Sequence, residues 1–207
     1  TYHRRQFDIP FIAITGTNGK TTTKELVSTV LDAHYKTHYT KGNYNNHIGV
    51  PLTLLAMPKD TEYAVIEMGA NHLGDIEFLC KIAEPTHGII TNIGKAHIGE
   101  FGGFEAIKKA KSELYDFIRK NNGRIFLNED EPFLADLAKK SKILAYGSIE
   151  KLNKEQAFHT QLKSTKPYVQ LQFLSDAGEA IQVNSNLIGE YNFKNICTAI
   201  AIGRYFK

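Results

Sequence analysis

The chain has 207 residues, of which 42% are hydrophobic and 23% charged, a balance typical of a globular protein with one large domain or two small ones. Its formal net charge of +3 is too small to argue for nucleic-acid binding by itself. No apolar run approaches the length of a membrane span, and the polar opening does not look like a signal peptide. The two cysteines, Cys80 and Cys197, lie in apolar helical patterns and are expected to be buried free thiols.

The first predicted strand, residues 10–14, leads into a glycine-containing loop and then directly into a helical pattern. The loop and its exit consist of Gly16, Thr17, Asn18, Gly19, Lys20, Thr21 and Thr22. This order is typical of a phosphate-binding loop, in which backbone N–H groups and the helix N-terminus face an anion. Lys20 can then reach terminal phosphates, and the Thr21 hydroxyl can hold Mg²⁺. The loop is shorter than the general motif, and the alternative is a glycine turn followed by an unrelated lysine.

A polar loop with three closely spaced asparagines, Asn43, Asn45 and Asn46, follows a possible strand at residues 35–40. Asparagine and glycine favour turns on their own account, so the loop can be a plain connector. The side-chain amides also offer donors and acceptors to a ligand. A short helix is predicted over residues 51–57.

The second core strand, residues 62–68, ends near Glu67. Open α/β sheets bind ligands at the carboxyl ends of their parallel strands, so Glu67 is a candidate Mg²⁺ ligand beside the phosphate loop. The alternative is an acidic residue that caps the following turn.

The next part of the chain alternates helices and strands. Helices are predicted over residues 73–83, 104–121 and 131–139, and strands over residues 87–93, 124–128 and 143–146. His97 lies just past a strand end, where it is either structural or a ligand. Lys108, Lys109 and Lys111 most simply form the solvated face of their helix. This alternation predicts a parallel sheet with helices on both faces.

The rhythm then changes to alternating apolar and polar residues over 156–163, 168–174 and 180–187, with a hairpin turn at Gly178. The fold prediction is therefore α/β: a P-loop-type, mostly parallel sheet flanked by helices, with a late antiparallel portion. That portion either extends the main sheet or forms a small sheet beside it. A final helix opens after Gly189, where Asn192 and Asn195 share one face. They form an N-cap and a surface amide, or a pair that contacts a base.

Four separated motifs resemble the central ATPase domain of the Mur ligase family. They are Gly16-Thr17-Asn18-Gly19-Lys20-Thr21-Thr22, Glu67-Met68-Gly69, the strand exit from Asn92 to His97, and Gly189-Glu190-Tyr191-Asn192-Phe193-Lys194-Asn195. The family builds the peptide stem of peptidoglycan, so the resemblance implies a bacterial cytoplasmic ligase. Residues 43–55 and 67–72 look most like the members that add D-Ala-D-Ala to UDP-N-acetylmuramoyl-tripeptide.

The resemblance implies roles for individual residues. Lys20 contacts the phosphates of ATP, Thr21 and Glu67 hold one Mg²⁺, and His97 helps to hold a second. Asn192 and Asn195 contact adenine. A lysine matching Lys111 is carbamylated by CO₂ in the family, which replaces an ammonium that repels Mg²⁺ with an anionic oxygen ligand. The catalytic set expected from the resemblance is Lys20, Glu67, His97 and Lys111.

The family's architecture implies that residues 1–207 are a central ATP-binding domain. An N-terminal domain for the UDP-sugar and a C-terminal domain that closes over ATP lie outside this chain, which alone is then an incomplete catalyst. The protein is expected to be a monomer that binds neither nucleic acid nor membrane. Its substrates are ATP, UDP-N-acetylmuramoyl-tripeptide and D-Ala-D-Ala, joined through an acyl phosphate with no protein nucleophile.

Three other functions stay open from the sequence. The first is another Mur ligase or a folylpolyglutamate-type ligase. The second is a non-catalytic P-loop switch that binds a nucleotide and regulates a partner. The third is nucleic-acid binding powered by the loop, against which the weak net charge and the lack of a basic, aromatic-interleaved stripe both argue.

Overall fold

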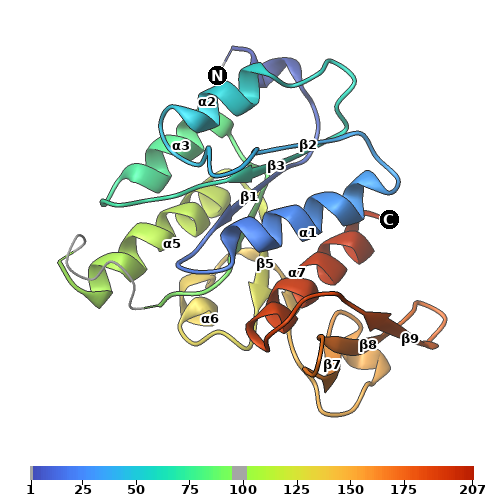
Figure 1. The fold of residues 1–207 in the computed structure, drawn as a ribbon. Helices are drawn as coiled ribbons and strands as arrows, with labels where there is room; N and C mark the ends of the chain where they lie inside the picture. Colours follow the sequence, from blue (N-terminus) through green and yellow to red (C-terminus); the bar gives the residue numbers. More distant parts are fainter. Residues whose placement is uncertain (1, 95–101) are drawn as a thin grey trace.

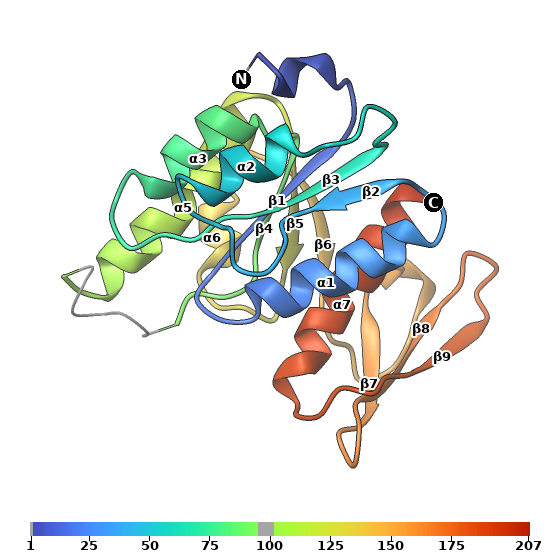
Figure 2. The ribbon, with the colours of Figure 1, turned by 45° about the horizontal axis from the view of Figure 1, so that its top comes forward.

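A six-stranded parallel sheet forms the centre of the molecule. The computed structural model describes residues 2–94 and 102–207. The strands are β1 (Phe11–Thr15), β2 (Thr37–Tyr39), β3 (Tyr63–Glu67), β4 (His87–Ile90), β5 (Arg124–Asn128) and β6 (Lys142–Tyr146). Their order is β2-β3-β1-β4-β5-β6 and each pairing is parallel, as Figure 2 shows. Strands β2 and β3 lie on one side of β1 in the sheet, and β4, β5 and β6 lie on the other. The strand order therefore reverses at β1, and open parallel sheets bind ligands at the carboxyl end of such a switch point.

Helices cover both faces of this sheet (Figure 1). One face carries α1 (Lys20–Asp32) and α7 (Tyr191–Phe206), and the other carries α2 (Gly49–Leu55), α3 (Asp75–Ala83), α5 (Phe104–Lys120) and α6 (Leu134–Leu137). Successive side chains of β1 point to opposite faces, because the strand repeats every two residues. Ile12 and Ile14 pack into the cluster under α1 and α7, whereas Phe11 and Ala13 join the other cluster. Both faces of the sheet are therefore buried, as the alternation of strands and helices predicted.

A small antiparallel sheet lies beside the main one, next to α7 (Figure 1). It consists of β7 (Thr160–Ser164), β8 (Gln170–Leu174) and β9 (Ala180–Asn184). Gly178, with φ of 83°, supplies the turn between β8 and β9. Val169 and Leu171 are fully buried in the same cluster as α7. The late strands thus form a separate sheet that shares the core of the domain, which settles the two alternatives left by the sequence.

Several predicted boundaries were wrong for local reasons. The helix predicted over residues 131–139 shrinks to α6, because Phe133 at its start has a left-handed φ of 75°. The strand predicted from residue 156 begins at Thr160, because Lys154–Gln156 forms a 3-10 turn capped by the Asn153 side chain. The strand predicted over residues 87–93 ends at Ile90, and the residues after it bond to the phosphate loop instead. A further 3-10 turn, Arg4–Gln6, precedes β1.

Two simpler expectations concern the thiols and the membrane. Cys80 and Cys197 are free and buried, as predicted, and burial raises the pKa of both thiols. Within residues 2–94 and 102–207, none of the helices combines the length and the apolar character that a membrane crossing requires.

Candidate active site

The loop between β1 and α1 needs glycine at two positions. Gly16 has φ of 141°, and a Cβ there would lie 2.0 Å from Thr91 Oγ1. Gly19 has φ of 77°, and a Cβ there would lie 2.6 Å from Asn195 Oδ1. Both are backbone conformations that side chains disfavour, in places where another residue already fills the space. The glycines of the sequence motif are therefore explained by the conformation of the loop and by its two neighbours, the exit of β4 and α7.

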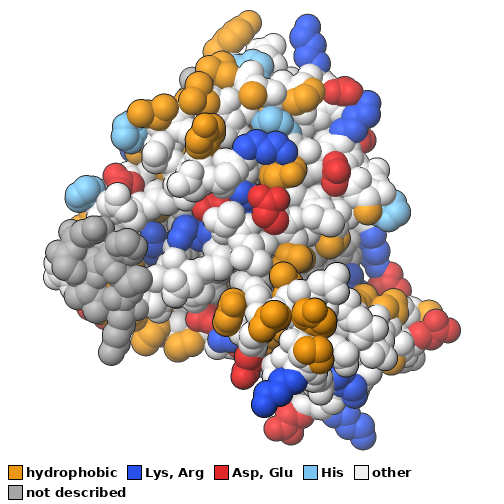
Figure 3. All heavy atoms as spheres, in the orientation of Figure 1, with side chains coloured by type: hydrophobic (Ala, Val, Ile, Leu, Met, Phe, Trp, Pro, Cys, Tyr) orange, Lys and Arg blue, Asp and Glu red, His pale blue; other side chains and the backbone are white. Residues whose placement is uncertain are grey.

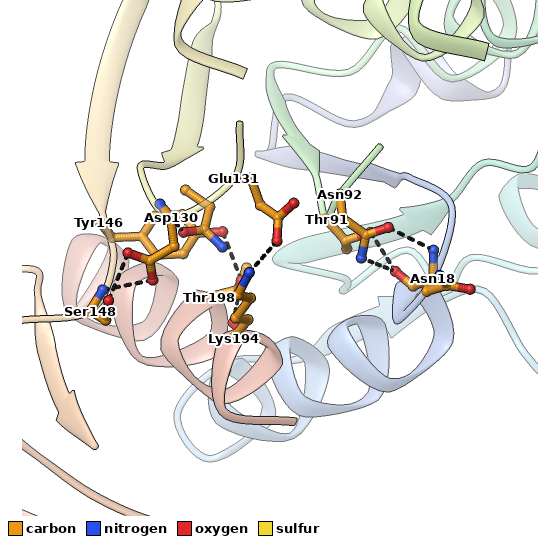
Figure 4. Close-up of polar contacts among 10 residues, drawn as sticks. Asn18, Thr91, Asn92, Asp130, Glu131, Tyr146, Ser148, Lys194 and Thr198 are labelled. Atoms are coloured by element: carbon orange, nitrogen blue, oxygen red, sulfur yellow. Dashed lines mark hydrogen bonds and ion pairs between the residues drawn. The ribbon is translucent and has the colours of Figure 1, made fainter. Parts of the chain in front are cut away.

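Hydrogen bonds fasten the loop to the residues that follow β4 (Figure 4). The Asn92 side chain accepts from Asn18 N at 2.9 Å and donates to Asn18 O at 3.0 Å. Thr91 Oγ1 donates to the same carbonyl at 2.7 Å. Gly94 N donates to Thr17 Oγ1 at 2.9 Å. These contacts hold the loop in one conformation, and a loop held in this way loses less entropy when it binds a ligand.

Lys20 opens α1 and folds back over the loop. Its Nζ donates to Gly16 O and Thr17 O, both at 2.9 Å. Burial lowers the pKa of Lys20, and the charge of Glu67 opposes that shift. The cation thus lies at the N-terminus of a 13-residue helix, where the helix dipole also favours an anion.

Glu67 ends β3 beside the loop, in register with Ile14 of β1. Its side chain is only 1% exposed. Oε1 accepts from Asn45 Nδ2 at 2.8 Å and from Thr21 Oγ1 at 3.2 Å. Oε2 is buried and has no hydrogen-bond partner among the described residues. Lys24 Nζ lies 3.6 Å from Oε2, beyond hydrogen-bond distance. A buried carboxylate oxygen that receives no hydrogen bond from the described residues, beside a threonine hydroxyl, suits a hard cation such as Mg²⁺.

A metal site built from protein side chains alone is not present in the part of the chain that the structure describes, where no three His, Cys, Asp or Glu side chains cluster. Mg²⁺ usually keeps waters and phosphate oxygens in its coordination sphere and takes only one or two carboxylates from the protein. The pair of Glu67 and Thr21 fits that pattern. His97, the predicted ligand of a second ion, lies outside the described residues.

Lys111 differs from the other lysines of α5. It is only 4% exposed, whereas Lys109 is exposed and Lys108 is half-buried with its Nζ 5.0 Å from the centre of the Phe133 ring. Burial, with help from the charge of Lys20, lowers the pKa of Lys111 to about 8, against the opposing charges of Asp75 and Glu113. A neutral amine is the form that reacts with CO₂, so this environment suits the predicted carbamate.

The two asparagines of α7 bond within the protein. Asn195 lies against the loop and its Oδ1 accepts from Thr23 Oγ1 at 3.1 Å. Its Nδ2 donates to Asn192 Oδ1 at 3.0 Å, and Asn192 Nδ2 donates to Ile188 O at 2.9 Å. Both residues are 6% exposed. The structure thus brings the predicted pair to the loop. Because a side-chain amide carries two hydrogens, each asparagine can donate one further hydrogen bond.

A pocket of about 430 Å³ opens beside Asn195. It is lined by the loop, the exit of β4 and the start of α7: Asn18, Thr91, Asn92, Ile93, Gly94, Glu131, Glu190, Tyr191, Lys194, Asn195 and Thr198. On its wall the Lys194 Nζ and Glu131 Oε1 atoms pair at 2.6 Å (Figure 4). The volume falls in the range of ordinary small-molecule sites.

The three asparagines of the asparagine loop have different contacts. Asn45 contacts Glu67, and its backbone carbonyl accepts from Gly69 N at 2.7 Å. Asn46 Oδ1 accepts from Ile48 N and from Gly49 N, the first N–H group of α2. Asn43 is exposed. A second pocket of about 430 Å³ lies here, lined by Asn45, Asn46, His47, Gly69, Ala70, Asn71, His72, Asp75, Phe78 and Leu79.

Three charged residues at this site were not singled out from the sequence. Lys24 lies on α1 next to Glu67, and Glu131 and Lys194 form the ion pair on the wall of the pocket. Lys24 stands four residues after Lys20, a spacing that places both on one side of a helix and offered a signal. Glu131 and Lys194 are 63 residues apart, and no local pattern connects them.

Comparisons with known proteins agree with one another. Residues 14–203 match the Mur ligase middle domain. The chain is 37% identical, over 204 residues, to the UDP-N-acetylmuramoyl-tripeptide--D-alanyl-D-alanine ligase of Bacillus subtilis (strain 168), covering 94% of this chain and 41% of that protein. It is 45% identical over 147 residues to the Synechocystis protein of the same name, covering 70% of this chain and 32% of the relative. The chain therefore spans less than half the length of these relatives.

Solved structures give the same result. A crystal structure of MurF from Acinetobacter baumannii superimposes with a TM-score of 0.84 at 36% identity, covering 97% of this chain and 44% of that one. MurF ligase from Thermotoga maritima in complex with ADP has a TM-score of 0.82 at 29% identity, covering 99% of this chain and 48% of that one.

Proposed function

The chain belongs to the Mur ligase family, and we propose that residues 1–207 are the ATP-binding middle domain of a ligase that joins D-Ala-D-Ala to UDP-N-acetylmuramoyl-tripeptide. The observation that carries the proposal is the meeting of Lys20, Thr21 and Glu67 at the exit of β1. There a cation, a hydroxyl and a buried carboxylate oxygen that lacks a donor among the described residues surround a preformed anion-binding loop. The similarity to the ligases that carry this name supports the choice of substrates.

The nucleotide is assigned to the loop and the pocket beside it. The phosphates of ATP bind the backbone of residues 16–22 and Lys20, which exchanges its two carbonyl partners for phosphate oxygens. The adenosine part enters the pocket lined by Asn195, whose second amide hydrogen is assigned to the base, and Asn192 supports Asn195 by accepting its other amide hydrogen. The Thermotoga maritima structure, solved with ADP, supports a nucleotide in this fold.

Thr21 and Glu67 are assigned to one Mg²⁺, and His97 with the carbamate of Lys111 to a second. The ions supply charge neutralisation for the transferring phosphoryl group. The chain's own contribution is position: Asn45 and Thr21 hold Oε1 of Glu67, and β3 delivers the carboxylate to the loop. The lowered pKa of Lys111 keeps part of its amine neutral and able to take up CO₂.

The acceptor is assigned to the side of the asparagine loop. The terminal carboxylate of the tripeptide lies there, close to the γ-phosphate, and accepts the phosphoryl group as ADP leaves. The amine of D-Ala-D-Ala then attacks the acyl phosphate and releases inorganic phosphate. Stabilisation of the developing charges by Lys20 and by the loop N–H groups is the protein's main task, and no protein nucleophile takes part.

Other parts of a longer protein complete the enzyme in this proposal. An N-terminal domain binds the UDP-sugar and a C-terminal domain closes over ATP. Figure 3 shows apolar side chains gathered over α2 and α3. Exposed apolar side chains there are consistent with contact to another domain: Ile48, Leu52, Leu55 and Phe78. The enzyme acts as a monomer in the bacterial cytoplasm, without nucleic acid or membrane insertion.

The test uses the natural full-length protein that contains this chain. Phosphate release from Mg-ATP is followed with UDP-N-acetylmuramoyl-tripeptide and a panel of amines and amino acids. Release that requires D-Ala-D-Ala supports the ligase and its substrates. Release with another amine or precursor keeps the ligase class but replaces the substrates. Folded protein that binds ATP and shows no acceptor-dependent release is a nucleotide-binding switch instead.

A further inference from the structure

Lys24 is a fully buried lysine in the first half of α1. Its side chain is 0% exposed, although lysine is among the residues least often buried. It lies one helical turn after Lys20, on the side of α1 that faces β3 and the asparagine loop. A buried ammonium is costly unless charges and acceptors surround it, so its partners define what it does.

Lys24 contacts two parts of the proposed site at once. Its Nζ donates to Gly42 O at 2.8 Å, at the start of the asparagine loop. The same Nζ lies 3.6 Å from Oε2 of Glu67, the carboxylate oxygen for which the described residues supply no hydrogen bond. A third partner, Oε1 of Glu25, lies 3.1 Å away, on a side chain that is 49% exposed.

The two carboxylate oxygens of Glu67 have different neighbours. Asn45 and Thr21 hold Oε1, while Lys24 faces Oε2 from α1. Asn45 belongs to the same loop whose carbonyl at Gly42 accepts from Lys24. One ammonium therefore connects α1, the asparagine loop and the end of β3. Loss of Lys24 removes the charge that faces Oε2 and also removes a tether of the loop whose Asn45 holds Oε1.

We propose that Lys24 is a positioning residue that orients Glu67 for the divalent cation and couples this carboxylate to the asparagine loop. Lys24 itself touches neither nucleotide nor metal. The inference rests on the proposed function, because it assigns Glu67 to the cation. It adds a residue without which the proposed metal ligand and the proposed acceptor loop lose their mutual alignment.

The test measures cation binding directly. Mn²⁺ binding to the full-length protein is followed by electron paramagnetic resonance in the presence of ADP, for the wild type and for Lys24→Met, which keeps an apolar stem and removes the charge. We expect Lys24→Met to weaken Mn²⁺ binding by about 10- to 100-fold, as loss of residues that orient metal ligands does. In steady-state kinetics kcat falls, while KM for ATP changes little, because Lys24 does not contact the nucleotide.

The matched control is Lys36→Met. Lys36 pairs with Asp60 at 2.6 Å, but its side chain is 66% exposed and lies outside the site. This variant removes the same chemical group and keeps the affinity of the wild type for Mn²⁺. Circular dichroism and thermal unfolding verify that each variant is folded. If Lys24→Met does not fold, Lys24→Gln replaces it, since an amide retains a donor for Gly42 O without the charge.

A double-mutant cycle with Glu67→Gln separates positioning from a general structural effect. If Lys24 acts through Glu67, Lys24→Met weakens Mn²⁺ binding much less in the Glu67→Gln background than in the wild type. Equal effects in both backgrounds, or unchanged Mn²⁺ affinity of folded Lys24→Met, overturn the inference and leave the proposed function standing. If the wild-type protein binds ADP but does not bind Mn²⁺, both the inference on Lys24 and the proposed cation site are overturned.

Discussion

At the scale of single residues, the site is a set of buried charges close together. Lys24 is a fully buried lysine, Lys20 is half-buried at the start of α1, and Glu67 is the buried carboxylate beside them. Burial strengthens each interaction and makes an uncompensated charge costly. The site therefore favours a ligand that brings several negative charges and cations of its own, which is the composition of Mg-ATP.

Replacement of Lys20 by alanine tests the phosphate contact. Lys20→Ala is expected to weaken Mg-ATP binding by about 10- to 100-fold, because a hydrogen-bonded charge is lost. The fold should remain intact, since the hydrogen bonds of Lys20 Nζ go to carbonyls of its own loop. Isothermal titration calorimetry measures the affinity, with Lys109→Ala on the exposed side of α5 as the control. Unchanged affinity in Lys20→Ala would remove the proposed role.

The pKa of Lys111 predicts how its carbamylation depends on pH. An amine reacts with CO₂ only when neutral, and the neutral fraction rises as the pH passes the pKa. With a folded pKa of about 8, the ¹³C carbamate signal at fixed dissolved CO₂ should rise between about pH 7 and 9. An ordinary lysine does so only near its usual value of about 10.4. The signal should be absent from Lys111→Gln, and a midpoint near the ordinary value contradicts the proposed environment.

The function of Lys111 has a separate test. Lys111→Ala should lose ligase activity and regain part of it when short carboxylic acids are added, because a free carboxylate can occupy the place of the carbamate. Phosphate release in the presence of both substrates measures this. Full activity of Lys111→Ala without any addition eliminates the carbamate from the mechanism.

At the scale of elements, the phosphate loop lies between three segments of the chain. The loop follows β1, is hydrogen-bonded to residues 91–94, and contacts Asn195 of α7 at Gly19. Because α1 begins at the loop, a displacement of Asn195 on α7 is expected to disturb the helix N-terminus to which the phosphates are assigned. The loop is thus sensitive to substitutions that touch no ligand.

Gly19→Ala tests this contact. The left-handed backbone costs an alanine about 1–2 kcal/mol, and its Cβ would also displace Asn195, 2.6 Å away. Gly74→Ala is the matched control: Gly74 also precedes a helix, with φ of 90°, and no described atom lies within 4 Å of its Cβ position. Both variants should lose stability in denaturant unfolding, Gly19→Ala more because of the contact with Asn195, and only Gly19→Ala should bind ADP more weakly. Equal ADP affinities would show that the contact with Asn195 has no influence on the loop.

At the scale of the whole molecule, the small sheet and the main sheet share one core. Val169 and Leu171 pack with α7 and the main sheet, and Thr160 and Tyr146 bond to Cys197 and Thr198 of the same helix. A shared core predicts one cooperative unfolding transition.

Leu171→Ala should therefore destabilise the whole domain by about 2–5 kcal/mol, because it opens a cavity in the shared core. The comparison is Ile181→Ala on the neighbouring strand, where the side chain is 41% exposed and the cost should be much smaller. Urea unfolding is followed in parallel by far-ultraviolet and near-ultraviolet circular dichroism. Two separate transitions would mean that the small sheet unfolds on its own.

The strands of the main sheet, the glycine loop between β1 and α1, and the family were predictable from the sequence alone, although some element bounds were not. These features depend on residues close together in the chain. They are an apolar strand followed by two glycines and a lysine before a helix, and apolar residues that recur every two positions in strands and every three to four in helices. The position of Glu67 beside the loop was predictable, because the parallel strands of such a sheet end at a common edge. Lys111 was identified by resemblance, and its burial against the exposure of Lys109 became visible only in the structure.

The partners of these residues depend on contacts between distant parts of the chain. Whether Phe133 would adopt a left-handed φ, and whether the late strands would form their own sheet, depends on packing against distant segments. Glu131 meets Lys194, and Lys24 meets both Gly42 and Glu67, because the fold brings together residues that are far apart in the chain. A periodic pattern shows which side of a helix is buried, but the charge that meets a buried side chain is determined by the other elements packed against it.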